Sequence, residues 1–139
     1  CPKTNSRASS EVRLLLDTHT FLWWLAGDER VSLAARETIA DEGHDVLVSA
    51  ASAWEITTKH RLGKLPLATL VAADVAAQVG AQGFGELAVT MAHAEHAGRL
   101  PGPHRDPFDR MLIAQALSEG LVLVSNETPF DRYGVQRLW

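Results

Sequence analysis

The amino-acid sequence predicts an α/β fold with helices on both faces of a central, mostly parallel sheet. Short apolar runs that are typical of buried strands alternate along the chain with longer segments in which apolar residues recur at helical spacing. Strands that are separated by helices favour parallel pairing, because the chain crosses one face of the sheet between one strand and the next. A length of 139 residues suits one domain with its own core.

The expected strands and helices can be placed in order along the chain. The strands cover residues 12–16, 45–48, 86–89, 121–124 and 135–138, of which 86–89 is the weakest. The helices cover residues 21–25, 32–42, 51–62, 70–81, 90–97 and 106–117, and residues 128–133 form a turn or short helix. Ser32, Ser49 and Thr90 supply the side-chain oxygens that N-cap positions favour. Gly63 ends the helix over 51–62.

The helix that starts at Asp106 carries two acids in its first turn. Asp106 is the expected N-cap, Pro107 occupies the first helical position, and Asp109 lies three residues beyond the cap. Both carboxylates would lie at the positive end of the helix dipole, so helix capping alone explains them. The helix then has an apolar stripe, formed by Phe108, Leu112, Ile113, Ala116 and Leu117.

Composition and charge limit the classes of protein that the chain could belong to. The net charge of −4 argues against a protein that coats nucleic acid through bulk positive charge. The single cysteine, Cys1, has no internal disulfide partner, and no apolar run approaches the ~18 residues that span a bilayer. Residues 1–11 lack the apolar stretch of a signal peptide and are expected to be a disordered tail or a cloning remnant, with the domain over 12–139. These features predict a cytoplasmic protein without a membrane segment.

The acids of the chain are expected to converge at one edge of the sheet. Asp17 ends the first strand, and Glu127 follows the strand over 121–124 by three residues. Glu55, Asp106 and Asp109 lie on helices whose ends meet the same edge, where ligands of parallel α/β sheets bind. Clustered carboxylates repel unless a counter-ion is present, and all-oxygen ligands favour Mg²⁺ or Mn²⁺. Such an ion suits the hydrolysis of a phosphodiester.

Four motifs in order resemble those of PIN-domain ribonucleases, and the closest likeness is to VapC-type toxins of bacterial toxin–antitoxin modules. They are Leu-Leu-Leu-Asp-Thr-His-Thr, Val-Ser-Ala-Ala-Ser-Ala-Trp-Glu-Ile, His-Arg-Asp-Pro-Phe-Asp-Arg-Met-Leu-Ile-Ala-Gln-Ala and Leu-Val-Leu-Val-Ser-Asn-Glu. The resemblance covers residues 14–139. It implies a three-layer α/β/α sandwich, a Mg²⁺-dependent endoribonuclease of the bacterial cytoplasm, a homodimer, and inhibition by a cognate VapB-type antitoxin.

The resemblance also implies roles for individual residues. Asp17 is the first acid, Glu55 the second, and Asp106 or Asp109 the third, with Asp109 preferred as metal ligand because Asp106 is already the N-cap. Glu127 stands at the fourth position, which is normally Asp, and Asn126 and Asp131 are substitutes for it. The expected supporting residues are Thr18, Ser49, Ser125 and Asn126.

Several other residues have a functional and a structural interpretation. Glu55 on a largely apolar helix side needs a partner, whereas Asp17 would equally serve as a helix cap. Candidate contacts to RNA phosphates are Lys59, Arg61, Lys64, Arg105 and Arg110, although a solvated basic helix end explains the first three as well. His93 and His96 have ligand-like spacing but are expected to be structural, and Trp23, Trp24 and Trp54 are expected in the core or at an interface.

Other functions can be weighed on the same residues. An aspartyl-phosphate phosphatase would carry a second Asp two residues after Asp17, where this chain has His19. The glycines of Gly83-Phe-Gly85 precede a strand, whereas a dinucleotide fingerprint follows one. Two alternatives remain open: a non-catalytic binding protein of the same fold, and a nuclease directed at DNA. The 2′-OH contact that distinguishes RNA from DNA is not visible in a sequence.

Overall fold

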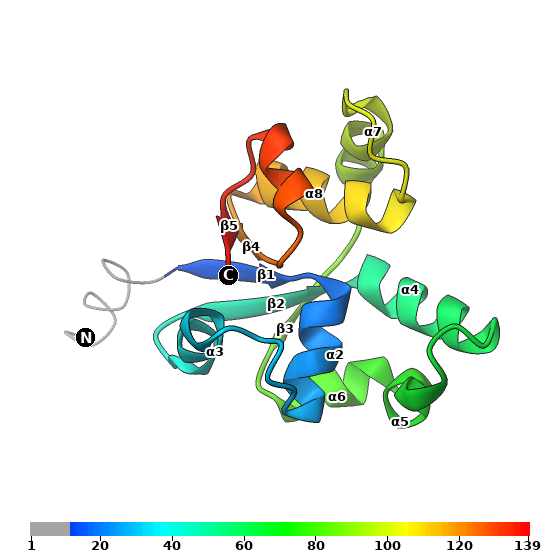
Figure 1. Ribbon diagram of the computed structural model, residues 1–139. Coiled ribbons are helices and arrows are strands. Elements are labelled where there is room, and N and C mark those ends of the chain that lie inside the picture. The colour runs from blue at the N-terminus through cyan, green and yellow to red at the C-terminus, as the bar shows by residue number, and fades with distance from the viewer. Residues whose placement is uncertain (1–11) are drawn as a thin grey trace.

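Five short strands form one sheet, in which all neighbouring strands run parallel. The computed structural model describes residues 12–139, so the tail expected over residues 1–11 lies outside the described residues. The strands are β1 (Arg13–Leu16), β2 (Asp45–Ser49), β3 (Gly85–Leu87), β4 (Val122–Val124) and β5 (Arg137–Leu138), in the order β3-β2-β1-β4-β5 (Figure 1). The predicted α/β class with a parallel sheet is confirmed.

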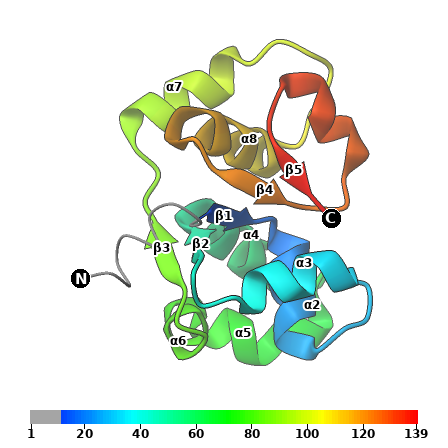
Figure 2. The same ribbon diagram turned by 90° about the vertical axis from the view of Figure 1, so that its left-hand side faces the viewer.

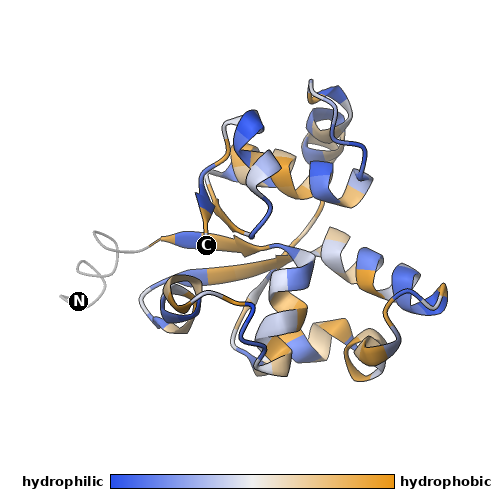
Figure 3. Ribbon diagram, in the orientation of Figure 1, coloured by the Kyte–Doolittle hydropathy of each residue, from blue (hydrophilic) through white to orange (hydrophobic). Residues whose placement is uncertain are grey.

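Helices cover both faces of this sheet and complete a three-layer sandwich. One face carries α2 (Thr18–Ala26), α3 (Leu33–Ala40), α4 (Ala50–Arg61), η1 (Pro66–Ala68), α5 (Thr69–Ala73) and α6 (Val75–Ala81). The other carries α7 (Met91–Arg99), α8 (Pro107–Glu119) and η2 (Thr128–Tyr133), as Figures 1 and 2 show. Leu14 and Leu16 of β1 pack into the core under the first layer, and Leu15 packs into the core under the second. The apolar residues of the middle strands therefore lie between two covered faces (Figure 3).

The predicted helix over residues 70–81 is wrong in one respect, because it is two helices. Asp74 separates α5 from α6, has non-helical backbone angles (φ −160°, ψ 83°), and accepts the Ala77 N–H at 3.0 Å. Its side chain acts as the N-cap of α6, and this contact competes with a continuous helix. The other boundaries shift by a few residues: α2 begins directly after Asp17, β3 begins earlier than predicted, and β5 is shorter.

The start of α8 confirms the predicted cap. Asp106 accepts hydrogen bonds from the N–H groups of Phe108 at 2.8 Å and Asp109 at 3.1 Å, and Pro107 occupies the first turn. Of the predicted apolar stripe, Leu112, Ile113 and Ala116 are buried, while Phe108 and Leu117 are partly buried. The cap places Asp109 in the first turn of α8, where the charge of Asp17 at the end of β1 acts on it.

Candidate acidic site

Asp17 lies at the end of β1, next to β4 in the sheet. Its side chain is buried and forms no cap of α2, so the capping interpretation of this residue is wrong. The Ser125 hydroxyl donates to Asp17 Oδ2 at 2.7 Å. Burial raises the pKa of Asp17, the Ser125 hydrogen bond and the nearby His19 oppose that rise, and the Glu55 carboxylate adds to it.

Glu55 reaches the same place from the first turns of α4 and is only 2% exposed. The Lys59 ammonium, one helical turn further on, donates to Glu55 Oε2. Oε1 of Glu55 is buried without any hydrogen-bond partner in the described chain. A buried carboxylate oxygen that accepts nothing costs free energy, so this atom is a candidate ligand for a cation.

Asp109 approaches from α8 and is held by His104. The distance between His104 Nε2 and Asp109 Oδ2 is 2.8 Å. Burial raises the pKa of Asp109 to about 6; the His104 hydrogen bond opposes the rise, and the charges of Asp106, Asp17 and Glu55 add to it. The charges of the three other acids therefore act on Asp109. We call Asp17, Glu55, Asp106 and Asp109 the acidic cluster.

His104 is a residue that the sequence analysis did not assign to the site. Its backbone N–H donates to the Tyr133 hydroxyl at 3.0 Å, and its carbonyl oxygen accepts from Arg110 Nη1 at 2.9 Å. Its ring meets that of Phe130 edge to face, with centroids 5.5 Å apart. The sequence feature that could have assigned His104 to the site is its position directly before Arg-Asp-Pro-Phe-Asp, in a loop that must fold back on the start of α8.

The predicted supporting residues separate into two groups. Ser125 contacts the acidic cluster directly, through Asp17. Thr18 and Ser49 are buried and link elements: Thr18 donates to Ser52 at 2.9 Å, and Ser49 donates to Gln115 at 2.6 Å while capping α4. Asn126 is exposed.

Glu127 lies outside the acidic cluster. Its side chain is exposed, and within residues 12–139 its carboxylate makes no hydrogen bond or ion pair. Its backbone N–H donates to the Ser125 hydroxyl at 3.1 Å. Asp131, the predicted substitute, pairs with Arg137 at 2.8 Å, and that hydrogen bond lowers its pKa. Neither carboxylate is among the charges that shift the pKa of Asp109, so neither belongs to the acidic cluster.

The five predicted RNA-contacting cations occupy different surroundings. Arg61, Lys64 and Arg105 are exposed, whereas Lys59 is paired with Glu55. The Arg110 guanidinium donates to the carbonyl oxygens of Ala97 (3.3 Å), Leu100 and His104 (2.9 Å). Arg110 therefore holds the end of α7 and the loop before α8 with three of its five N–H donors, and its role as a phosphate contact stays a prediction.

The fit of a metal ion can be tested on the donor atoms. In residues 12–139, no three Asp, Glu, His or Cys side chains are arranged to hold an ion as they lie. Lys59 and His104 instead bond one oxygen each of Glu55 and Asp109. The unpartnered Glu55 Oε1 and the all-oxygen donor set of the acidic cluster still match the chemistry of a hard divalent cation.

The remaining aromatic and histidine predictions have clear outcomes. His93 is buried, accepts the Thr90 N–H at 3.1 Å and lies 2.8 Å from Glu119, which confirms a structural role. Trp23 and Trp24 are partly buried against the first core. Trp54 does not belong to the core, because 65% of it is exposed. Every helix within residues 12–139 is too short or too polar to cross a lipid bilayer.

The family follows from comparison with known proteins. The PIN domain model matches residues 14–136, so the chain belongs to the PIN domain family. A curated relative is Ribonuclease VapC22 of Mycobacterium tuberculosis (strain ATCC 25618 / H37Rv), 30% identical over 115 residues that cover 82% of this chain and 86% of the relative.

Solved structures support the same fold. VapBC2 from Rickettsia felis, bound to a DNA fragment from its promoter, aligns with a TM-score of 0.66 and 14% identity over 91% of this chain and 98% of that one. Mycobacterium tuberculosis VapC20, a toxin that cleaves the sarcin-ricin loop, aligns with a TM-score of 0.61 and 22% identity over 88% and 95%. The fold and the relatives together assign the chain to the VapC-type group of PIN domains.

Proposed function

We propose that this chain is a Mg²⁺-dependent endoribonuclease that hydrolyses RNA phosphodiester bonds at the acidic cluster. The observation that carries the proposal is Glu55, a 2% exposed carboxylate with one oxygen left unpartnered among other acids. A structural carboxylate in the interior would have both oxygens satisfied. The VapC relative, which is named a ribonuclease, supports RNA as the substrate.

Asp17, Glu55 and Asp109 would hold the ion directly, and Mn²⁺ could replace Mg²⁺. Asp106, whose Oδ1 caps α8, and Glu127, at the rim of the site, would contribute through water. When bound, the ion would polarise a phosphoryl oxygen and lower the pKa of the attacking water.

Side chains next to the acids orient the carboxylates that would bind the ion. The Ser125 hydroxyl orients Asp17, and His104 orients Asp109, so that the second oxygen of each carboxylate can face the ion. Lys59 supplies a positive charge that offsets the cluster before an ion binds. Arg61, Lys64 and Arg105 are free at the surface to meet phosphates of the RNA.

A VapB-type antitoxin and a second copy of the chain are the proposed partners. The Rickettsia felis structure is a VapBC complex, which supports an antitoxin partner here. Trp23 and Trp24 line a hollow of about 240 Å³ together with Arg36. Both tryptophans lie on α2, which begins directly after Asp17, so a peptide bound along this helix could place an Arg at the acidic cluster. Exposed leucines that suit a homodimer are Leu62 (53%), Leu67 (100%) and Leu70 (82%).

Light scattering and co-purification test these partners. A dimer at micromolar concentration, and a stable complex with the co-encoded antitoxin, are expected. A strictly monomeric protein that ignores its co-encoded neighbour would contradict the partner proposal.

Matched substrates test the activity. Single-stranded RNA and DNA of one sequence are incubated with the protein in Mg²⁺ or in EDTA, with Asp17→Asn as the control for contaminating nuclease. We expect cleavage of RNA only, in Mg²⁺ only, and by the unaltered protein only. Cleavage of DNA would favour a nuclease directed at DNA, and inertness on both would favour a non-catalytic binding protein.

A further inference from the structure

Trp54 is a large aromatic side chain that the core does not use. It lies on α4 directly before Glu55 and is 65% exposed, whereas its neighbours on the helix, Glu55 and Ala51, are buried. Its ring meets Phe108 edge to face, with centroids 4.9 Å apart and planes at 76°. In the described chain, its indole N–H has no acceptor. The ring is therefore held in place on one side and presented to solvent on the other.

A pocket of about 350 Å³ opens beside this ring. Its walls are largely apolar and come from α4, α7, α8 and the segment after β3, with Trp54, Phe108, Met111, Val89 and Ala97 among them. Arg110 also lines the pocket, but its guanidinium donates to the carbonyl oxygens of Ala97 in α7 and of Leu100 and His104 in the loop before α8. The size suits a flat ring system, and most of the walls are apolar.

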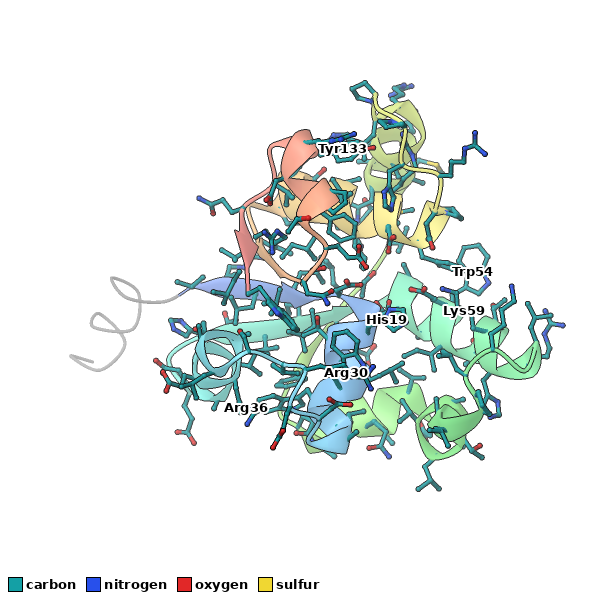
Figure 4. All side chains as sticks on the ribbon, in the orientation of Figure 1. His19, Arg30, Arg36, Trp54, Lys59 and Tyr133 are labelled. Atoms are coloured by element: carbon teal, nitrogen blue, oxygen red, sulfur yellow. The ribbon has the colours of Figure 1, made fainter. Side chains whose placement is uncertain are left out.

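The pocket adjoins the acidic cluster through shared segments. Trp54 precedes Glu55 on α4, and Phe108 lies between Asp106 and Asp109 at the start of α8. The Lys59 ammonium bonds Glu55 and also lies 5.9 Å from the centroid of the Phe108 ring. Figure 4 shows Trp54 and Lys59 projecting from α4 toward α8. A polymer with a phosphate at the acids would have its adjacent units at this pocket.

We infer that this pocket binds an unpaired nucleobase of the RNA, with Trp54 as its stacking surface. The inference rests on the proposed function, because it places the base next to the phosphodiester at the acidic cluster. Unpaired bases stack on exposed aromatic side chains in many RNA complexes. The exposed cations Arg61 and Lys64 at the end of α4 and Arg105 before α8 complement a polyanion, while the largely apolar pocket complements a base. This division of charge favours a nucleic acid strand over a protein segment.

Binding of two short RNA strands tests the inference. The probes are an unstructured 12-nucleotide RNA of mixed sequence and its abasic counterpart, which keeps the ribose-phosphate backbone. Fluorescence anisotropy in EDTA measures affinity without cleavage, over a series of salt concentrations. The variants are Trp54→Ala, Trp54→Phe and, as a matched loss of an exposed apolar side chain elsewhere, Leu33→Ala, at a residue that is 69% exposed on α3.

Trp54→Ala should bind the intact strand roughly 5- to 150-fold more weakly, because one stacking contact is lost. Trp54→Phe should keep most of the affinity, and Leu33→Ala all of it. The abasic strand should bind equally weakly to the unaltered protein and to Trp54→Ala. The slope of log affinity against log salt should not change in Trp54→Ala, because no phosphate contact is removed. Since Trp54 is exposed, all three variants should melt close to the unaltered protein.

Three results would overturn the inference. In the first, Trp54→Ala binds the intact strand within twofold of the unaltered protein; in the second, it loses the same affinity for the intact and the abasic strand. In the third, Trp54→Ala changes only the binding of a second copy or of the antitoxin. The last result would assign the pocket to a protein partner. A cleavage assay in Mg²⁺ separates this inference from the proposed function. If Trp54→Ala still cleaves RNA and binds it with unchanged affinity, only the inference of a base-binding pocket is wrong. If the unaltered protein binds RNA in a base-dependent way but cleaves none, only the proposed nuclease activity is wrong.

Discussion

Replacing Asp109 with asparagine probes the electrostatics of the acidic cluster without knowledge of the RNA that is cut. Asp109 has an ordinary pKa of 3.8 and a folded-state pKa of about 6. The folded protein therefore binds more protons than the unfolded chain between these values. The contribution of Asp109 to the free energy of unfolding is therefore greatest below pH ~4 and falls as the pH rises through about 6. Asparagine resembles the protonated acid, so the variant should lack this fall.

The size of the effect can be bounded from the structure. The difference between 3.8 and about 6 corresponds to at most about 3 kcal/mol. One fifth of the side chain is exposed, and solvent screening reduces the figure to about 1–2 kcal/mol. At pH 7.5 in EDTA, Asp109→Asn should therefore melt roughly 3–8 °C above the unaltered protein, and near pH 4 the two should melt together.

Mg²⁺ should reverse the order of the two proteins. An ion that binds only the folded state adds about 2.7 kcal/mol at a hundred times its dissociation constant, and the variant should gain much less. Melting curves of both proteins in EDTA and in Mg²⁺ give the four values needed. Asp131→Asn is the control, because Asp131 is paired with Arg137 outside the cluster and should lose stability without changing the Mg²⁺ response. If Asp109→Asn melts lower in EDTA yet gains the full Mg²⁺ increment, Asp109 is structural and the site must centre on Asp106.

Four further variants address the other members of the site. Asp17→Asn should lower the turnover of RNA at least ~10²-fold with little loss of stability, as steady-state cleavage and melting curves would reveal. His104→Gln should weaken Mn²⁺ binding, measured by calorimetry, about 10- to 100-fold, while His96→Gln at the exposed contact with α8 leaves it unchanged. Arg110→Ala should lower the free energy of unfolding by about 2–4 kcal/mol in denaturant titrations, because three carbonyl oxygens lose their donor. Glu127→Gln should change turnover less than threefold, and a loss like that of Asp17→Asn would show that the rim residue moves into the cluster.

The fold was predictable because its signals are local. Apolar runs identified the strands, and capping residues such as Asp106 identified helix starts, where one side chain satisfies neighbouring N–H groups. The break at Asp74 was hidden for a physical reason. Val71, Val75 and Val79 recur every four residues straight through it, so the periodicity of the buried face continues where the backbone does not.

The site was predictable only in part. Asp17, Glu55 and Asp109 converge as expected from strand ends and helix starts, since the carboxyl ends of parallel strands share one edge. The hydrogen bond from His104 and the exposure of Trp54 depend on how loops and helices pack in three dimensions. Arg110 shows most clearly what the sequence alone does not reveal. It stands beside acids in the sequence, yet its guanidinium donates to backbone carbonyl oxygens, and no sequence pattern indicates this.

The central position of β1 governs when the acidic cluster can form during synthesis of the chain. The Asp17 N–H donates to the Val124 carbonyl oxygen at 3.0 Å, and the Asp17 carboxylate accepts from Ser125, more than a hundred residues later in sequence. Chains grow at about 5–20 residues per second, so several seconds separate the two halves of this contact. Until β4 has left the ribosome, Asp17 lacks both the strand that fixes its backbone and the hydroxyl that orients its carboxylate. A nascent or truncated chain that ends before residue 122 is therefore without an assembled site.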